Sequence, residues 1–338
     1  MTALRVLTNS EMTTRRRCAR EHHLRYNLGI RPIEDSEALR FGDLIHQALE
    51  VWWGWHRDAA QHAPAYDFAS DEPLELALAH LASLDIEAFE RVKLEELLRG
   101  YHCRWSMAMA DFEVLAVEVE FRAPLVNPTS NRASFTYQQG GKIDVLLRER
   151  STRRVLVMDH KSSSEDVSTG STYWRRLRLD SQVSTYFAGV EALGYVPAAW
   201  LHDVIGKPTI RPSKATPMEA RKYTEPKYKQ CPECKKKPKK GEPALPPPPH
   251  LVQIGEASND ATGALLTATA MCEEGETPEA PRRICTDRGG KLYANLREFD
   301  ETPEEYRARL RESIAAEPDR YYVRGEVVRL EEELRDHA

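Results

Sequence analysis

The sequence of 338 residues predicts an α/β protein in which helices come first, paired strands follow, and one more helix and strand complete the domain. Apolar residues recur every three or four positions through much of residues 36–109, which is the spacing of a buried helix face. At residues 114–121 the apolar residues instead alternate with polar ones, and between residues 140 and 163 two apolar runs flank a polar turn. These observations predict one α/β domain that ends near residue 205.

The first part of this domain, residues 1–110, is expected to be mainly helical. Apolar residues between Ser36 and Trp53 lie at positions 39, 41, 44–45, 48–49 and 52–53, so they share one helix face. A second helical stretch runs from about Pro73 to Met109, with a break expected near Asp85. Cys103 lies in this stretch and is expected to be a buried helix residue.

The second part, residues 111–205, is expected to contain the sheet. Its strands should include the two that meet across the turn near residue 151, because both are rich in Val, Ile and Leu. The prolines at 124 and 128, followed by Thr-Ser-Asn, predict a loop over Pro124–Asn131. The remaining elements, in chain order, are a strand at Val114–Phe121, a helix at Asp180–Leu193 that ends at Gly194, and a strand at Ala198–Ile205.

The composition changes after residue 205. Residues 206–240 contain twelve Lys or Arg against three Glu, and Pro246–Pro249 is an unbroken proline run, so residues 206–290 are predicted to be a basic, Pro-rich and largely irregular insertion. Residues 291–338 are predicted to be a C-terminal helical segment. A helix should begin at Thr302-Pro303, with a capping Thr, a proline in the first turn and acidic residues after it, and the chain should end in a charged helix over Glu326–Ala338.

Composition also limits the class of protein. A formal net charge of −5 argues against a globally basic nucleic-acid coat, and no apolar run approaches the roughly 20 residues of a membrane span. The first residues lack the apolar segment of a secretory signal, so a cytoplasmic protein without membrane contact is expected. The six cysteines are then expected to be thiols or metal ligands rather than a disulfide framework.

Two aspartates and a lysine are the residues most suited to chemistry. Asp144 lies on the first strand of the pair, and Asp159 and Lys161 share one face of the second strand because side chains two apart point the same way. Carboxylate oxygens suit Mg²⁺, the backbone carbonyl of His160 lies between the two residues, and a lysine can position a water, deprotonate it or stabilise negative charge. The alternative interpretation is a surface hairpin with a salt bridge.

Two helical spacings flank this group. Gly42-x-x-x-His46 and Gln182-x-x-x-Tyr186 each place two residues one turn apart on a helix face. Either spacing alone is equally compatible with structural residues. In chain order, however, Gly-x-x-x-His, Gly-x-x-Asp, Asp-x-Lys and Gln-x-x-x-Tyr over residues 10–205 resemble the PD-(D/E)xK nuclease superfamily, and specifically its RecB-like branch of phage exonucleases and CRISPR adaptation nucleases.

The resemblance implies a restriction-endonuclease-like fold, with a mixed central sheet flanked by helices. It also implies that Asp144, Asp159 and His46, with the His160 carbonyl, hold Mg²⁺ or Mn²⁺. By the same resemblance Lys161 is the catalytic lysine, and Gln182 and Tyr186 line the DNA side. The third acidic position is Asp159 rather than the commoner Glu, but the set is intact, which argues against a non-catalytic relative.

The activity implied is hydrolysis of DNA phosphodiesters to leave a 5′-phosphate, by an exonuclease acting on ends or single strands in phage-type recombination or end processing. Relatives of this branch often act beside a helicase, an annealing protein or an integrase. A CRISPR adaptation nuclease is the alternative enzyme, although the long 206–290 insertion disfavours it. A non-catalytic, zinc-stabilised nucleic-acid-binding module is the alternative of a different class.

The cysteines predict further metal sites. The segment around Cys18, Arg17–Ile30, resembles the N-terminal cysteine segment of the iron–sulfur members of this branch, where one early and three late cysteines hold a [4Fe-4S] cluster. No cysteine follows Cys285, so either the chain is truncated, the cluster is absent, or other cysteines substitute. Cys231-x-x-Cys234 has zinc-knuckle spacing, which Cys272 and Cys285, or His250, could complete. The alternative is an irregular basic loop with reduced thiols.

Basic residues near the predicted site are candidates for phosphate contacts. Arg175, Arg176 and Arg178 come just before the Gln182 helix and are expected to bind DNA phosphates. The basic run from Lys207 to Lys240 could bind phosphates in the same way or could be a solvated loop.

Overall fold

The computed structural model divides the chain into two compact units. Residues 1–211 and 303–338 form the first unit, and residues 212–302 form the second. The described residues are 4–33, 36–62, 67–127, 130, 132–168, 170–177, 180–222, 228–230, 251–253, 258–259, 265–266, 269–271, 283–285, 292–293 and 296–329.

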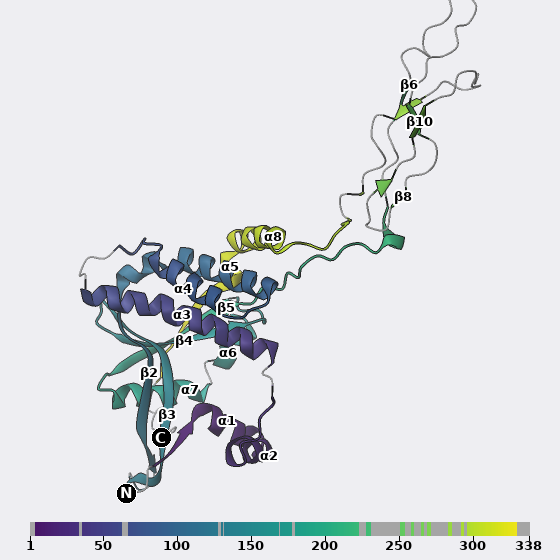
Figure 1. The fold of residues 1–338 in the computed structure, drawn as a ribbon. Helices are drawn as coiled ribbons and strands as arrows, with labels where there is room; N and C mark the ends of the chain where they lie inside the picture. The colour runs from purple at the N-terminus through teal and green to yellow at the C-terminus, as the bar shows by residue number, and fades with distance from the viewer. Residues whose placement is uncertain are drawn as a thin grey trace, which may run out of the picture. The chain divides into compact units, whose positions relative to one another are not determined.

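The first unit is built on a six-stranded mixed sheet (Figure 1). The strands run in the order β1-β3-β4-β5-β12, with β2 paired to β3 outside this path. β1 and β3 are parallel, as are β4 and β5, whereas β2–β3, β3–β4 and β5–β12 are antiparallel. Their bounds are β1 (Arg5–Thr8), β2 (Phe112–Asn127), β3 (Arg132–Glu149), β4 (Val155–Ser163), β5 (Pro197–Gly206) and β12 (Tyr322–Val327).

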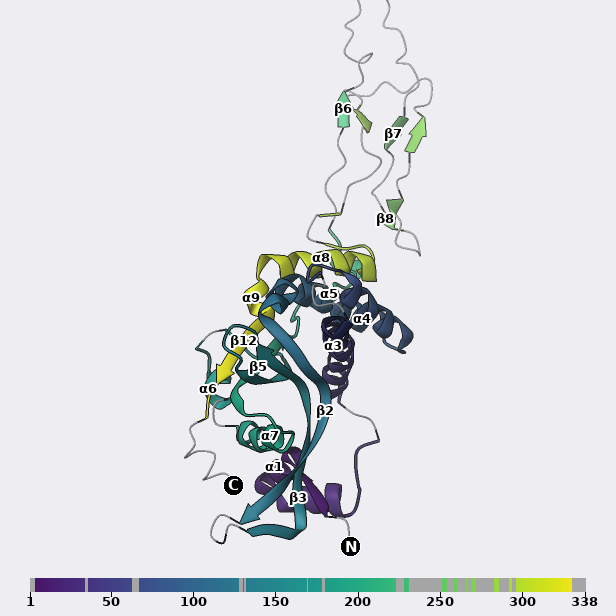
Figure 2. The same ribbon diagram turned by 90° about the vertical axis from the view of Figure 1, so that its left-hand side faces the viewer.

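Helices cover the sheet on both sides (Figure 2). The helices α3 (Glu37–His62), α4 (Glu72–Ser83), α5 (Ala88–Trp105) and α8 (Pro303–Ala316) form one layer, and α7 (Ser181–Ala192) lies on the opposite face. The shorter elements are α1 (Asn9–Arg17), α2 (Ala19–His22), a π-helix (His23–Asn27), a 3-10 helix (Met107–Asp111), α6 (Thr172–Leu177), a 3-10 turn (Met218–Ala220) and α9 (Pro318–Tyr321). A mixed sheet between helical layers is the restriction-endonuclease-like architecture that the resemblance implied, so this prediction is confirmed.

The alternation of β4 explains why two hydrophobic cores meet at this strand. Val155 and Val157 pack in the core beneath α7, whereas Leu156 and Met158 pack in the larger core beneath α3, α4 and α5. Because side chains alternate between the two faces of a strand, the polar residues that follow Met158 also point alternately toward these two sides. Asp159 and Lys161 therefore face α7, and His160 faces the α3 layer.

Besides β2, the long strand β3 pairs with two further strands along its length. Its residues Tyr137–Gly140 pair with β1, and its residues Val145–Arg148 pair with β4. Gly141 lies between the two pairings, where a Cβ would come within 2.8 Å of the Phe121 ring. The glycine of the Gly-x-x-Asp spacing is therefore required by close packing, because an aromatic ring in a filled core cannot move aside cheaply.

The loop predicted at Pro124–Asn131 is wrong in its first part, because β2 continues through Pro124 to Asn127. β2 is an edge strand that pairs only with β3, and its register shifts between Pro124 and Val126. A proline is tolerated at such a position because the missing N–H is not needed by a second neighbour.

The predicted C-terminal helix at Glu326–Ala338 is also wrong where the structure describes it. Residues Tyr322–Val327 form β12, whose Tyr322 pairs with Ile205 and whose Val327 pairs with Trp200. The open edge of β5 offers backbone hydrogen bonds that a local reading of the sequence cannot include. The expected burial of Cys103 is wrong as well, because this residue lies on an exposed face of α5. The helix predicted to begin at Pro303 is present as α8.

The second unit contains short strand pairs. β6 (Tyr228–Gln230) pairs with β11 (Arg283–Cys285), β7 (Leu251–Gln253) with β10 (Thr269–Met271), and β8 (Ser258–Asn259) with β9 (Leu265–Leu266). The predicted zinc ligands Cys231, Cys234 and Cys272, and the alternative His250, lie outside the described residues, and Cys285 is described only as the last residue of β11. Among the described residues, no helix has the length and apolar character to cross a bilayer.

Candidate metal centre

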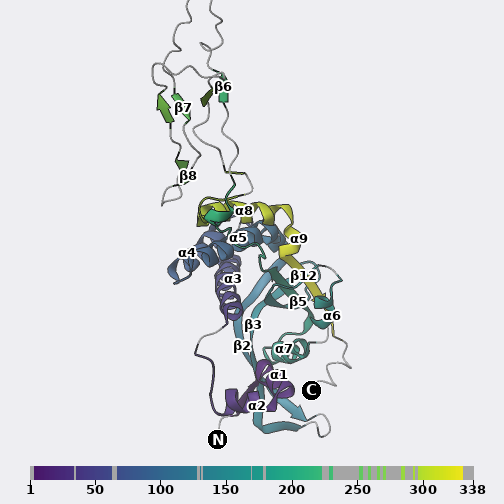
Figure 3. The same cartoon turned by 90° about the vertical axis from the view of Figure 1, so that its right-hand side faces the viewer.

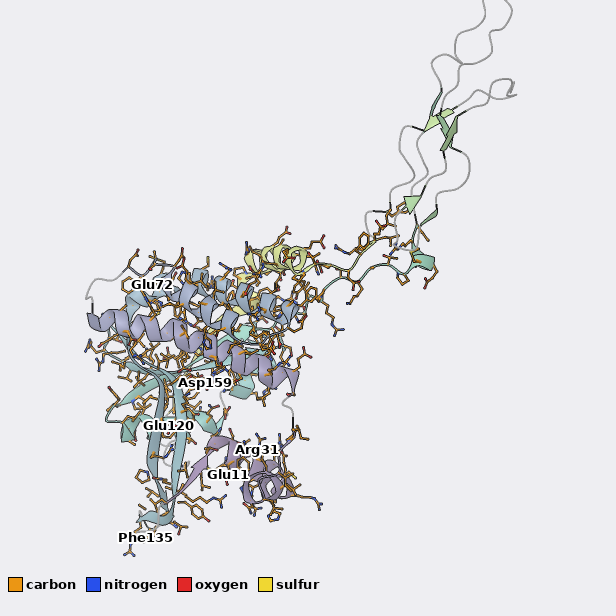
Figure 4. The ribbon with its side chains drawn as sticks, in the orientation of Figure 1. Glu11, Arg31, Glu72, Glu120, Phe135 and Asp159 are labelled. Carbon is orange, nitrogen blue, oxygen red and sulfur yellow. The ribbon has the colours of Figure 1, made fainter. Side chains whose placement is uncertain are left out.

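The candidate site lies where β3 and β4 separate. The last residue pair between the two strands is Val145 with Met158. Asp144 and Asp159 occupy the next position on each strand, where the strands are no longer paired. Here a side chain replaces the backbone hydrogen bond between the strands, because Asp144 Oδ2 accepts the backbone N–H of His160 at 2.8 Å. The end of the pairing therefore brings two carboxylates to one point at the centre of the sheet, where Figure 4 labels Asp159.

Asp159, Lys161 and Gln182 form a closed triangle. Asp159 is 5% exposed, and its Oδ2 lies 2.7 Å from Lys161 Nζ. The Gln182 side chain from α7 donates Nε2 to Asp159 Oδ1 at 3.0 Å and accepts Lys161 Nζ at 3.3 Å. Burial alone lowers the pKa of a lysine, but the carboxylates of Asp159 and Asp144 raise the pKa of Lys161 above its ordinary value.

His46, Glu118 and Asp144 form a second group around Asp144. Each offers one ligand atom, and these atoms lie within 4.8 Å of one another. His46 Nδ1 is 3.5 Å from Asp144 Oδ2, and Glu118 also pairs with Lys142 of β3. Two carboxylates and an imidazole are a donor set that fits a divalent cation such as Mg²⁺ or Mn²⁺.

The close approach of α3 explains how His46 reaches this group. A Cβ on Gly42 would lie 3.3 Å from Ser162 Oγ, so the helix contacts β4 directly at the glycine. His46 follows one helical turn later and therefore reaches Asp144, where β3 and β4 separate. The Gly-x-x-x-His spacing is thus explained by the fold, because Gly42 allows the close approach of α3 to β4 and His46 lies beside Asp144.

The carboxyl group of Asp144 is electrostatically unusual. Burial, together with the nearby Asp159 carboxylate, raises the pKa of Asp144 to about 7. Burial also lowers the pKa of His46, against the opposing effect of Asp159. Burial lowers the pKa of His202, which lies behind Asp159, to about 4. The repulsion between two such carboxylates decreases when a cation binds, because the cation supplies positive charge between them.

Comparisons with known proteins agree with this geometry. The family model of the PD-(D/E)XK nuclease superfamily matches residues 6–336. The chain belongs to this superfamily. Membership implies a nuclease that uses divalent metal ions and a nucleic-acid substrate.

The other comparisons add little to this assignment. A comparison with curated proteins returns no match. One solved structure that matches, titled "Crystal structure of SSO0001", is 14% identical, with a TM-score of 0.19, over 55% of this chain and 69% of that one.

Behind the metal centre of this PD-(D/E)XK protein lies a buried polar network that the sequence did not predict. His160 Nδ1 is 2.8 Å from Asp203 Oδ2, Tyr101 donates its hydroxyl to the same oxygen at 2.6 Å, and Arg324 Nε donates to Oδ1 at 2.8 Å. Burial alone raises the pKa of an aspartate, but Arg324 and His160 hold the pKa of Asp203 well below its ordinary value. The network fixes the ring of His160, whose backbone N–H binds Asp144.

The structure brings together Asp144, Asp159, Lys161, His46 and Gln182 of the predicted set. Tyr186 lies one turn after Gln182, and its ring packs between Phe121 and Trp200 at centroid distances of 5.2 and 5.3 Å. Tyr186 is half-buried and also hydrogen-bonds Gln182, and its expected place on the DNA side stays a prediction.

The remaining predicted residues lie apart from this group. Arg175 and Arg176 are exposed on α6, where Arg176 pairs with Glu165 at 2.8 Å, and Arg178 lies outside the described residues. Cys18 is exposed and caps α2 by accepting the Glu21 N–H at 3.4 Å. The [4Fe-4S] expectation for Cys18 stays a prediction.

Glu118 is the residue of the centre that sequence reasoning missed. It lies in the alternating segment Leu115–Phe121, whose pattern predicts that its acidic side chains point to solvent. The sequence therefore does not distinguish Glu118 from an ordinary surface residue. The structure turns it inward through a left-handed backbone with φ of 53°, between the pairs Val117–Val145 and Val119–Ile143. Such a local irregularity redirects a side chain, and only the folded strand reveals it.

Proposed function

We propose that this protein is a Mg²⁺- or Mn²⁺-dependent deoxyribonuclease of the RecB-like branch. It hydrolyses phosphodiester bonds at DNA ends or in single strands and leaves a 5′-phosphate, as in phage-type recombination or end processing. The observation that carries the proposal is the convergence of Asp144, Asp159 and Lys161 with His46 and Glu118 at the point where β3 and β4 separate.

Each residue has a role that follows from its surroundings. Asp144, Asp159, His46 and Glu118 would hold the cation, which when bound supplies Lewis-acid charge and lowers the pKa of water. Lys161, whose Nζ lies 2.7 Å from Asp159 Oδ2, is placed to stabilise negative charge on the phosphate or to position the attacking water. Gln182 holds the Asp159 carboxylate and the Lys161 ammonium in place through its two hydrogen bonds.

The proposal is tested with labelled single-stranded DNA, duplex DNA and single-stranded RNA in the presence of Mg²⁺, Mn²⁺ or EDTA. We expect metal-dependent cleavage of DNA that Asp159→Ala and Lys161→Ala each reduce by roughly a hundredfold or more. Cleavage in EDTA, or unchanged activity in both variants, would remove the mechanism. Preference for RNA would overturn the proposed substrate.

Glu118 allows a matched comparison within one strand. Glu118→Gln should reduce metal-dependent cleavage about tenfold to a hundredfold, because it removes a charge beside Asp144. Glu120→Gln is the control, since the Glu120 side chain is 70% exposed and pairs with Arg122 instead. Equal effects of the two substitutions would exclude Glu118 from the metal centre.

The metal predictions for the cysteines are tested separately. Metal analysis of protein purified without oxygen distinguishes iron, zinc and neither. A non-catalytic zinc module predicts bound zinc together with nucleic-acid binding that does not respond to Asp159→Ala. A CRISPR adaptation nuclease predicts trimming of short duplexes in the presence of an integrase.

A further inference from the structure

Five arginines form an exposed surface on the N-terminal helices. Arg15, Arg16, Arg17, Arg20 and Arg25, called here the N-terminal arginine surface, lie on α1, α2 and the π-helix, and all are exposed. One acidic residue, Glu21, lies within residues 15–25, so this short segment has a net charge of +4 in a chain whose total is −5. Exposed positive charge concentrated in this way attracts polyanions.

The segment that carries these arginines is joined to the first unit, called here the nuclease unit, through β1, which pairs with β3. Glu11 is 6% exposed, and its Oε1 binds Arg5 NH2 at 2.6 Å and His22 Nε2 at 3.0 Å. One buried carboxylate thus joins β1, α1 and α2. The Thr8 hydroxyl caps α1 by accepting the Glu11 N–H at 3.2 Å. The arginines are therefore displayed on a folded platform.

This platform lies beside the metal centre. Arg16 NH1 is 3.4 Å from Ser181 Oγ, and Ser181 is the residue before Gln182, which binds Asp159 and Lys161. The Ser181 hydroxyl also donates to Asn9 Oδ1 at 3.3 Å. Figure 3 shows α1 next to α7, and Figure 4 labels Glu11 in the same segment. Arg16, one member of the N-terminal arginine surface, therefore contacts the residue directly before Gln182 of the candidate site.

Four of these five arginines lack an acidic partner within the described part of the chain. Arg17 pairs with Glu21 at 2.6 Å, Arg16 contacts the Ser181 hydroxyl, and no ion pair involves Arg15, Arg20 or Arg25 there. Arg25 lies over the Tyr26 ring at 5.6 Å, and that ring stacks on His22 at 5.4 Å. Exposed guanidinium groups, one of them beside an aromatic ring, are a combination that binds nucleic-acid strands without reading their sequence.

We propose that the N-terminal arginine surface binds the phosphate backbone of the DNA strand whose scissile phosphate occupies the metal centre. This inference rests on the proposed function and adds to it the path of the substrate across α1 and the start of α7. Guanidinium groups bind phosphate oxygens through fixed pairs of N–H donors, which gives affinity without sequence preference. A long strand reaches this surface, and a small phosphodiester does not.

The test compares two substrates in the full-length protein with Mn²⁺. The variant Arg15→Gln/Arg20→Gln/Arg25→Gln leaves Arg16 and its contact with Ser181 intact. We expect KM for a 30-nucleotide single strand to rise roughly tenfold, and the slope of log Kd against log salt to fall by about 2, since each lost single-strand contact contributes about 0.7. The kcat/KM for bis(p-nitrophenyl) phosphate should stay within about twofold, because that substrate contacts the metal centre alone.

The control removes the same charge elsewhere. Arg57→Gln/Arg104→Gln/Arg153→Gln changes arginines on α3, on α5 and in the β3–β4 turn, and it should leave both the KM and the salt slope near wild type. The proposal is overturned if the first variant binds the long strand as wild type does, if the control has an equal effect, or if the small diester loses activity in parallel.

Failure of the proposed function gives a different result. If wild type hydrolyses neither substrate, the deoxyribonuclease proposal fails. Anisotropy of a labelled 30-nucleotide strand in EDTA still decides the present inference, because it measures the arginine surface without catalysis. Normal binding by Arg15→Gln/Arg20→Gln/Arg25→Gln in that assay would refute it.

Discussion

Removal of the Arg324 guanidinium should destabilise the nuclease unit far more than removal of a comparable surface arginine. Arg324 and Asp203 are 10% and 1% exposed in their side chains and lie 2.8 Å apart. The change Arg324→Met keeps most of the volume but leaves the Asp203 charge buried without its strongest partner. Breaking a buried pair in this way costs about 3–5 kcal/mol. Loss of the guanidinium, 3.9 Å from the Trp105 ring centroid, adds roughly 1 kcal/mol.

Arg104→Met is the matched control. Arg104 also lies over Trp105, at 5.3 Å, and pairs with Asp319 at 2.6 Å, but these side chains are 40% and 83% exposed. Water screens such a pair, so its loss should cost less than about 1 kcal/mol. The two variants each remove an Arg–Asp pair of similar length beside the same tryptophan, so the difference between their losses of stability measures the effect of burial.

Urea unfolding followed by tryptophan fluorescence measures both losses. All six tryptophans lie within residues 52–200, so the signal reports the nuclease unit alone. Equal losses for Arg324→Met and Arg104→Met would refute the reasoning. The double variant Asp203→Asn/Arg324→Met should be more stable than Arg324→Met, because the unpaired charge is then absent, and a double variant that is less stable would contradict the assigned cause.

Three further predictions follow from the same sites. The pKa of Asp144 near 7 means that a proton must leave before a cation binds, so the Mn²⁺ affinity measured by calorimetry should rise about fivefold from pH 6 to pH 7, about twofold more by pH 8 and then level off, and a flat profile would contradict this. The depressed pKa of Asp203 contributes stability that is complete above about pH 4 and is lost as the pH falls toward its folded value, so the gap between wild type and Arg324→Met in urea should narrow from pH 5 to pH 3. Gly141→Ala should cost about 1–3 kcal/mol, and Phe121→Leu in the same chain should recover part of it, whereas a neutral Gly141→Ala would refute the packing argument.

Local patterns were enough to predict the central features of the site. The period of two along β4 placed Asp159 and Lys161 on one face, and the helical period placed His46 one turn after Gly42. These are properties of neighbours in the chain, so they do not depend on the rest of the fold. The same applies to the start of α8, where capping chemistry is local.

Long-range contacts could not be predicted in the same way. Arg324 joins Asp203 across a sequence separation of 121 residues, and its strand forms only because β5 offers a free edge. Gln182 reaches Asp159 because α7 packs on that face of the sheet, which the spacing Gln-x-x-x-Tyr does not specify. Glu118 enters the centre through a backbone irregularity in β2 that alternation conceals.

The sequence by itself determined the fold class, the superfamily and the order of the acidic and basic residues along the chain, because periodicity and spacing are encoded locally. The tertiary structure alone decided which carboxylate is crowded, which side chains surround Lys161 and which arginine supports the centre from behind. Those properties depend on burial and on distances between segments far apart in the chain, and charges acquire their pKa values only when folding removes water around them.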